Sequence, residues 1–179
     1  MKNLVCLFVL LLSSTTLSAY GQGVKRPRTV EDYQPRTLRE LKDLLPPAFA
    51  ADEQVKNNYQ SLAIIVHGDL LPSRVHAAYQ GTTRQLNERR QSLIAQWAKE
   101  RAGSLEFYKS YDTEALFTAD GEDYWLAVRK ESLPQIEQEL KQGDAVELFL
   151  IKMGNIRIDN KLEPVILIEK YAKHTGTSN

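Results

Sequence analysis

The chain has 179 residues, with 23 Lys or Arg and 23 Asp or Glu, so its formal net charge at pH 7 is zero. Without net positive charge it has no long-range field that would draw it onto nucleic acid or an anionic membrane surface, so no nucleic-acid partner is favoured. The length is sufficient for one domain with its own hydrophobic core.

The first 21 residues have the composition of a secretory signal peptide. Lys2 precedes an apolar run over residues 4–12, and small and polar residues follow as far as Gly21. Export requires this order of a positive residue, a short apolar helix and small residues at the cleavage site. The run is too short to cross a bilayer core of about 30 Å. We therefore predict a signal peptide over 1–21, no transmembrane anchor after its cleavage, and a bacterial protein that is periplasmic or secreted.

Cleavage at this position also removes the single cysteine of the chain, Cys6. The mature chain then has no disulfide, no thiol nucleophile and no thiolate metal ligand. Because the leader contains Lys2 and no acidic residue, the mature chain carries one more acidic than basic residue. A cysteine-free exported domain of this size depends on hydrophobic burial alone, which is common in bacteria.

Residues 22–60 form a polar arm whose first part, with prolines at 27 and 35, is expected to bury almost nothing. Thr37 and Glu40 have the spacing of a capping box, in which each side chain bonds a free backbone amide at a helix start. The helix predicted over 38–45 ends at Pro46 and has one apolar face, formed by Leu38, Leu41, Leu44 and Leu45. We expect this helix to dock onto the domain in cis; a helix that binds a partner protein is the alternative.

The single domain is predicted over residues 61–172. Strands over 61–67 and 74–80 are expected to form a hairpin, and a short strand is expected over 105–108. The spacing of apolar residues predicts a long amphipathic helix over 82–102. The residues on its buried face are Leu86, Leu93, Ile94 and Trp97.

The second half of the domain contains one clear hairpin and one short helix. Strands over 115–118 and 124–130 flank an Asp-Gly pair at 120–121, which marks a tight turn that tolerates positive φ. Ser132 is predicted as the N-cap of a helix that ends at Gly143, with Pro134 in its first turn.

Two strongly apolar strands complete the domain, over 145–153 and 165–171, before a disordered tail at 173–179. Their apolar residues do not alternate cleanly with polar ones, so both faces of these strands are expected to be covered. The pattern predicts an α+β fold with a small curled antiparallel sheet or partly open β-barrel of the oligonucleotide/oligosaccharide-binding (OB) type. One long amphipathic helix and one short helix accompany the sheet.

Part of this region resembles uncharacterised exported bacterial proteins. The segments that carry the resemblance are YWLAV at 124–128, ELKQGDAVELF at 139–149 and VILI at 165–168, within residues 115–171. The resemblance implies a bacterial, exported protein. It implies no activity, ligand or catalytic residue.

Two groups of side chains are candidate sites. His67, Asp69 and His76 lie near the loop ends of the predicted hairpin, where two imidazoles and a carboxylate could hold zinc or copper, with exposed strand-end histidines as the alternative. The second group could bind an anionic or sugar ligand through guanidinium contacts and ring stacking, and consists of Arg84, Arg89, Arg90, Tyr124 and Trp125. The alternative is that nearby carboxylates neutralise the arginines while Trp125 fills the core.

No catalytic residue and no cofactor are predicted, since the mature chain lacks cysteine, a Gly-x-Ser-x-Gly elbow and a glycine-rich phosphate loop. We expect a non-enzymatic exported domain that binds a protein or small ligand, or that has a role in the cell envelope. One alternative is a small metal-assisted hydrolase centred on the His/Asp hairpin. A second is an OB-like binder of oligonucleotides or oligosaccharides.

Overall fold

The computed structural model describes residues 28–44, 64–66, 72–99 and 106–173. The predicted signal peptide, His67, Asp69 and Gly103 lie outside the described residues, as do residues 174–179 of the predicted tail. Lys173 is the last residue of the final strand.

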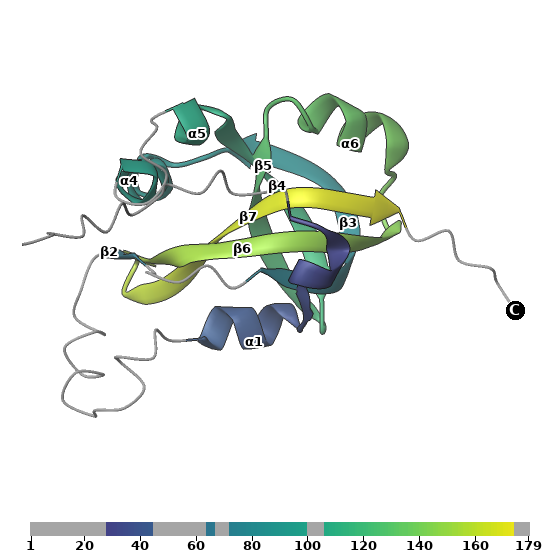
Figure 1. Cartoon of the computed structure of the whole chain (residues 1–179), viewed down its shortest axis with the longest axis horizontal. Helices are drawn as coiled ribbons and strands as arrows, with labels where there is room; N and C mark the ends of the chain where they lie inside the picture. The colour runs from purple at the N-terminus through teal and green to yellow at the C-terminus, as the bar shows by residue number, and fades with distance from the viewer. Residues whose placement is uncertain (1–27, 45–63, 67–71, 100–105, 174–179) are drawn as a thin grey trace, which may run out of the picture.

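The described chain folds into one sheet with helices on its surface (Figure 1). The order along the chain is η1 (Val30–Asp32, a 3-10 helix), β1 (Gln34–Pro35), α1 (Leu38–Asp43), β2 (Ile64–Val66), β3 (Ser73–Gln85), α4 (Glu88–Trp97), α5 (Glu106–Lys109), β4 (Tyr111–Ala119), β5 (Glu122–Arg129), α6 (Leu133–Glu139), β6 (Ala145–Ile158) and β7 (Lys161–Lys173). The strand order is β1-β3-β4-β5-β7-β6-β2, and β3 also pairs with β6.

This extra pairing makes the hydrogen-bonded strands run in a ring, β3–β4–β5–β7–β6 and back to β3. If the five strands of the ring are numbered by their order in the chain, with β3 as the first, their order around the ring is first, second, third, fifth, fourth. Helix α6 lies in the connection between the third and the fourth of them, β5 and β6. The prediction of an α+β fold with a small curled, OB-like sheet is therefore confirmed, except that two strand pairs, β1–β3 and β5–β7, are parallel rather than antiparallel. The longer and shorter predicted helices are α4, with 10 residues, and α6, with 7.

Two hydrophobic clusters occupy the two faces of the curled sheet. The first lies inside the ring, where α1 contributes Leu38 and Leu41, and α6 with its C-cap contributes Ile136 and Leu140 from the opposite side (Figure 1). The second lies between α4 and the outer faces of β6 and β7 and contains Leu93, Ile94, Trp97, Ile151 and Leu167, among others. Both faces of β6 and β7 are thus covered, as the unbroken apolar runs predict.

The long helix begins later than predicted. Residues 82–85 continue strand β3, where Thr83, Arg84 and Gln85 pair with β4. The helix begins only after Asn87, whose side chain accepts a hydrogen bond from the backbone N–H of Arg90 at 2.9 Å. Gly81, with φ at +68°, lies at the register shift between Tyr79 and Thr83 where β3 turns from β6 towards β4. The apolar spacing correctly identifies the buried helix face, but the cap decides where the helix starts.

The predicted hairpin between 61–67 and 74–80 is wrong. Strand β2 pairs antiparallel with β6, Ile64 with Ile156 and Val66 with Gly154, while β3 pairs with the other half of β6. Because β6 is 14 residues long, it extends past Ser73, the first residue of β3, and offers its remaining edge to β2. Residues 106–108 of the strand predicted over 105–108 belong to the short helix α5 (Glu106–Lys109) instead.

The arm is more firmly attached than its polar composition suggests. Tyr33 is buried, packs edge-on against Phe149 with ring centroids 5.1 Å apart, and donates a hydrogen bond to Glu169 at 2.6 Å. The capping box forms as predicted: Thr37 Oγ1 accepts from Glu40 N at 3.0 Å, and Thr37 N donates to the Glu40 carboxylate at 2.7 Å. Leu38 and Leu41 are completely buried, so α1 docks in cis.

Local signals in the second half of the domain give a mixed outcome. The Asp-Gly turn is confirmed, because Asp120 and Gly121 adopt φ of 54° and 76° and Ala119 pairs with Glu122. Ser132 precedes α6 as predicted, but its side chain makes no capping hydrogen bond.

Candidate functional site

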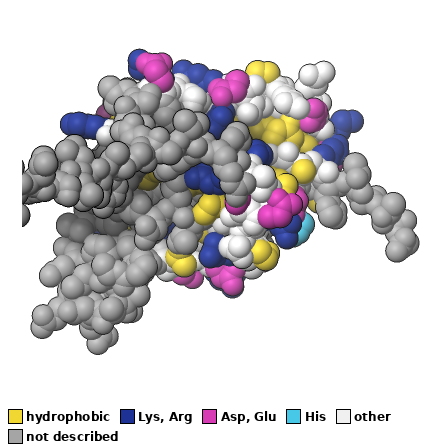
Figure 2. All heavy atoms as spheres, in the orientation of Figure 1, with side chains coloured by type: hydrophobic (Ala, Val, Ile, Leu, Met, Phe, Trp, Pro, Cys, Tyr) yellow, Lys and Arg dark blue, Asp and Glu magenta, His cyan; other side chains and the backbone are white. Residues whose placement is uncertain are grey.

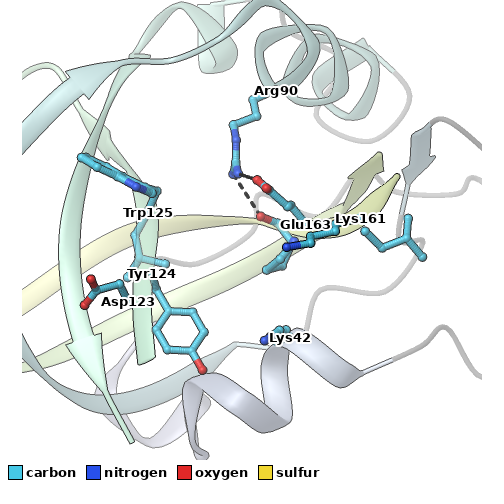
Figure 3. A pocket seen from close by; sticks show the side chains of 10 residues that line it. Lys42, Arg90, Asp123, Tyr124, Trp125, Lys161 and Glu163 are labelled. Carbon is cyan, nitrogen blue, oxygen red and sulfur yellow. Dashed lines mark hydrogen bonds and ion pairs between the residues drawn. The ribbon is translucent and has the colours of Figure 1, made fainter. Parts of the chain in front are cut away.

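A cleft of about 260 Å³ opens between β5 and β7 (Figure 3). The side chains that define it come from four elements: Lys42 from α1, Arg90 from α4, Tyr124 and Trp125 from β5, and Lys161 and Glu163 from β7. Arg90 points towards Glu163 from α4, while Lys42 lies on the α1 side of the opening (Figure 3).

The cleft exists because β5 and β7 separate. These two parallel strands share a single pair in the ring, Ala127 with Leu167. Before that point, residues 123–126 of β5 and residues 161–164 of β7 form opposite walls of the cleft. Each of these strands is paired along its other edge, β5 with β4 and β7 with β6, so the separation leaves one backbone edge of each strand facing the cleft.

Arg90 closes the α4 side of the cleft through a buried ion-pair network. Its Nη1 lies 3.1 Å from Glu114 Oε1 and donates to the carbonyl of Pro164 at 3.1 Å, and its Nη2 pairs with Glu163. Glu114 also accepts from Arg84 Nε at 2.8 Å. The side chains of Arg90 and Glu114 are only 4% and 1% exposed. The network contains two arginines and two glutamates, so its formal charges cancel.

The two aromatic residues of β5 extend to opposite sides of the strand, as the pleat requires (Figure 3). Trp125 lies on the outer face, where the Arg84 guanidinium stacks over its ring at 3.9 Å from the centroid. Tyr124 packs into the inner cluster, is 6% exposed, and donates from its hydroxyl to Glu122 at 3.1 Å. Burial, and then this contact with Glu122, raises the pKa of Tyr124 to about 12.

The α1 side of the cleft is held by exposed ion pairs. Lys42 Nζ lies 3.0 Å from Glu122 Oε2, and Arg39 lies 3.3 Å from the other oxygen of the same carboxylate. The hydrogen bond from Lys42, followed by the one from Tyr124, lowers the pKa of Glu122. These contacts tie α1 to Glu122, the first residue of β5, on this side of the cleft.

The sequence-predicted ligand residues fall into three positions. Arg90, Tyr124 and Trp125 line the cleft, and Arg84 covers Trp125 from outside it. Arg89 is exposed and donates to the Arg157 carbonyl at 2.7 Å, and it is not among the lining residues. The carboxylates that neutralise Arg84 and Arg90 are Glu114 and Glu163, from β4 and β7.

Sequence reasoning missed Lys42, Lys161 and Glu163. Lys161 and Glu163 follow a tight turn at Asp159 and Asn160, whose φ values are 46° and 62°. The Asp-Asn pair was an available signal for that turn, since both residues tolerate positive φ. Lys42 carries no signal of its own, because nothing local indicates where α1 docks.

The predicted metal group is only partly described. His76 lies on β3 with its side chain 71% exposed, and its Nε2 is 3.9 Å from Glu147 Oε1. His67 and Asp69 lie outside the described residues. Among the residues that the structure does describe, no three His, Cys, Asp or Glu side chains are grouped so as to hold a metal ion.

Neither a scan against protein-family models nor a search of curated proteins finds a match to this chain. The fold and the cleft define a structural class: a small α+β domain with OB-like strand order and an opening between strands β5 and β7. None of the helices in the described part of the chain has the length and apolar character needed to cross a membrane.

Proposed function

We propose that this protein is an exported, non-enzymatic binding module whose ligand occupies the cleft between β5 and β7. The observation that carries this proposal is the position of the cleft. In OB-type sheets, ligands lie against the second and third strands and beside the loops that follow the first and fourth. The equivalent parts here are β4, β5, the segment that contains α4, and the turn between β6 and β7. The cleft is lined by residues 123–126 of β5, by Arg90 of α4 and by Lys161, which directly follows the turn.

The charges around the cleft support binding rather than proton transfer. Arg90 forms ion pairs with Glu163 and Glu114, and Lys42 forms one with Glu122, so these charged groups connect the elements around the cleft. The same pairing weakens the case for an oligonucleotide ligand, because a binder of phosphates needs cations that are free to replace counterions. On the face shown in Figure 2, acidic and basic side chains are interspersed among the described residues.

Ligand binding is tested by mapping amide shifts on ¹⁵N-labelled protein of residues 22–179. The probes are cellotriose, a capped pentapeptide and the trinucleotide dT₃, each added to millimolar concentration. We expect at least one probe to shift amides of residues 123–126 and 161–164 and the Trp125 indole, and the Arg89→Ala variant, altered outside the cleft, to respond as the natural protein does. Shifts confined to other surfaces, or none with any probe, would contradict the proposal.

Export is tested by the mass of the mature protein. We expect the full-length chain, expressed in a Gram-negative host, to be recovered from the periplasm or medium with a mass that lacks residues 1–21. A charge placed in the apolar run, Leu10→Arg, should leave the intact chain in the cytoplasm because the segment is then too polar to enter the export channel. Recovery of a periplasmic protein that still carries Met1 would count against the predicted cleavage.

A further inference from the structure

We infer that the ligand of this cleft is a peptide segment in extended conformation, which pairs its backbone with the facing edges of β5 and β7. The inference rests on the proposed function and specifies the ligand class of the same site. It follows from three features of the described part of the cleft: two strand edges without strand partners, aromatic rings with little surface open for stacking, and Lys161, which makes no ion pair there.

The strand edges are the first feature. Strand β5 pairs with β4 from Glu122 to Arg129, and β7 pairs with β6 along nearly its whole length, but the two strands meet each other only at Ala127 and Leu167. Within the described residues, the edges over 123–126 and 161–164 therefore have no strand partner, apart from the Pro164 carbonyl that Arg90 occupies. Backbone amides and carbonyls in such positions need partners, and an extended peptide supplies them in the spacing of a sheet.

The aromatic residues are the second feature. Saccharides and nucleic-acid bases depend on open ring faces for stacking. Tyr124 is 6% exposed because its ring belongs to the inner cluster, and one face of the Trp125 ring is covered by the Arg84 guanidinium. Arg84 and Arg90 already bind Glu114, so phosphate groups would have to compete with a buried carboxylate. The cleft thus offers little stacking surface and no free guanidinium.

Size and charge are the third feature. The volume of about 260 Å³ is below the 300–1,000 Å³ typical of pockets that enclose a whole small molecule. A short stretch of a longer chain fits such an opening, since its two ends continue into solvent. Lys161 lines the cleft and makes no ion pair within the described chain, whereas Glu163 is bound to Arg90. An acidic side chain or a terminal carboxylate on the peptide would complement Lys161.

A single defined peptide is enough for the test. In strand addition the affinity comes from main-chain hydrogen bonds, so many different peptide sequences can bind. The probe is acetyl-Val-Thr-Val-Glu-Val-amide, titrated into ¹⁵N-labelled protein of residues 22–179. Its control is the same peptide with N-methyl groups on alternate amides, which keeps the side chains and removes the hydrogen-bond donors. We expect shifts over 123–126 and 161–164 with the parent peptide and at least tenfold weaker binding of the methylated peptide.

The charge is tested with Lys161→Gln and with a peptide in which Gln replaces Glu. We expect Lys161→Gln to weaken binding of the acidic peptide about three- to tenfold and to leave the affinity for the neutral peptide unchanged. Arg89→Gln, outside the cleft, should change the affinity for neither peptide. Equal binding of the parent and methylated peptides, or peptide shifts on another surface, would overturn the inference. Shifts at the cleft with cellotriose or dT₃ but not with the peptide would overturn it while leaving the proposed function intact. No shift at the cleft with any probe would overturn both.

Discussion

Replacing Arg90 with Met is expected to lower the free energy of unfolding by about 3–5 kcal/mol. Among the described residues, the substitution leaves Glu114, which is 1% exposed, with Arg84 as its only cationic partner, and Arg84 is itself 41% exposed. It also removes the donors to Glu163 and the Pro164 carbonyl, so α4 loses these polar contacts with β7 and keeps only its apolar ones. A buried carboxylate that loses its partner keeps its full cost of desolvation, which is why the effect is large. Urea unfolding followed by circular dichroism measures it.

Two further variants separate this cause from a general loss of packing. Arg89→Met, one residue earlier on the exposed side of the same helix, should cost less than about 1 kcal/mol because Arg89 makes only an exposed contact with the Arg157 carbonyl. The double variant Arg90→Met with Glu114→Leu should recover most of the lost stability, since the two charges that remain, Arg84 and Glu163, are 41% and 38% exposed and can be hydrated. A single Arg90→Met variant as stable as Arg89→Met would show that the network does not hold α4 in place.

Lys152 is expected to make the protein more stable as the pH rises from about 8 to 10. Its side chain is 1% exposed, and its Nζ donates to the carbonyls of Lys42 and Leu44, at 3.1 and 2.7 Å, at the end of α1. Burial lowers the pKa of Lys152 to about 8, and the charge of Asp43 opposes that shift only in part. Above this pKa the folded protein has released the proton while the unfolded chain still holds it, so the free energy of unfolding increases with pH.

The Lys152→Met variant removes this titration. Because each pKa unit corresponds to about 1.4 kcal/mol, we expect the stability of the natural protein relative to the variant to rise by about 2–3 kcal/mol between pH 7 and pH 10. Tyrosines with raised pKa, such as Tyr124 and Tyr171, titrate in both proteins and cancel in the difference. The exposed Lys170→Met is the control and should show no such rise. Parallel stability curves for Lys152→Met and the natural protein would contradict a lowered pKa of Lys152 in the folded state.

Features that depend on neighbouring residues are readable from the sequence. The capping box at Thr37 and Glu40 and the turn at Asp120 and Gly121 each satisfy backbone requirements within four residues, and both form as predicted. The buried face of α4 is also local, because Leu93, Ile94 and Trp97 are brought together by the helix repeat alone. The α+β class also follows from local patterns of apolar residues, and it is confirmed. The predicted ends of individual helices and strands, by contrast, differ from those in the structure.

Strand partners are different, because a strand satisfies its hydrogen bonds equally well with any available edge. Proximity in the sequence predicts that β2 pairs with β3, yet the extra length of β6 beyond β3 supplies the edge that β2 uses. Tyr33 shows the same limit for a side chain: its segment is polar, but Phe149 and Glu169 on distant strands bury it.

From the sequence alone came the α+β class, the local turns and caps, and three of the residues that line the cleft: Arg90, Tyr124 and Trp125. Only the tertiary structure decided that Arg84 and Arg90 are neutralised by Glu114 and Glu163, and that Lys42 and Lys161 join the site. The physical reason is that the cleft is produced by the separation of two strands that meet at a single pair, Ala127 and Leu167. That separation depends on the closure of the whole ring and on α1 and α4 docking at its sides, which no local pattern of residues encodes.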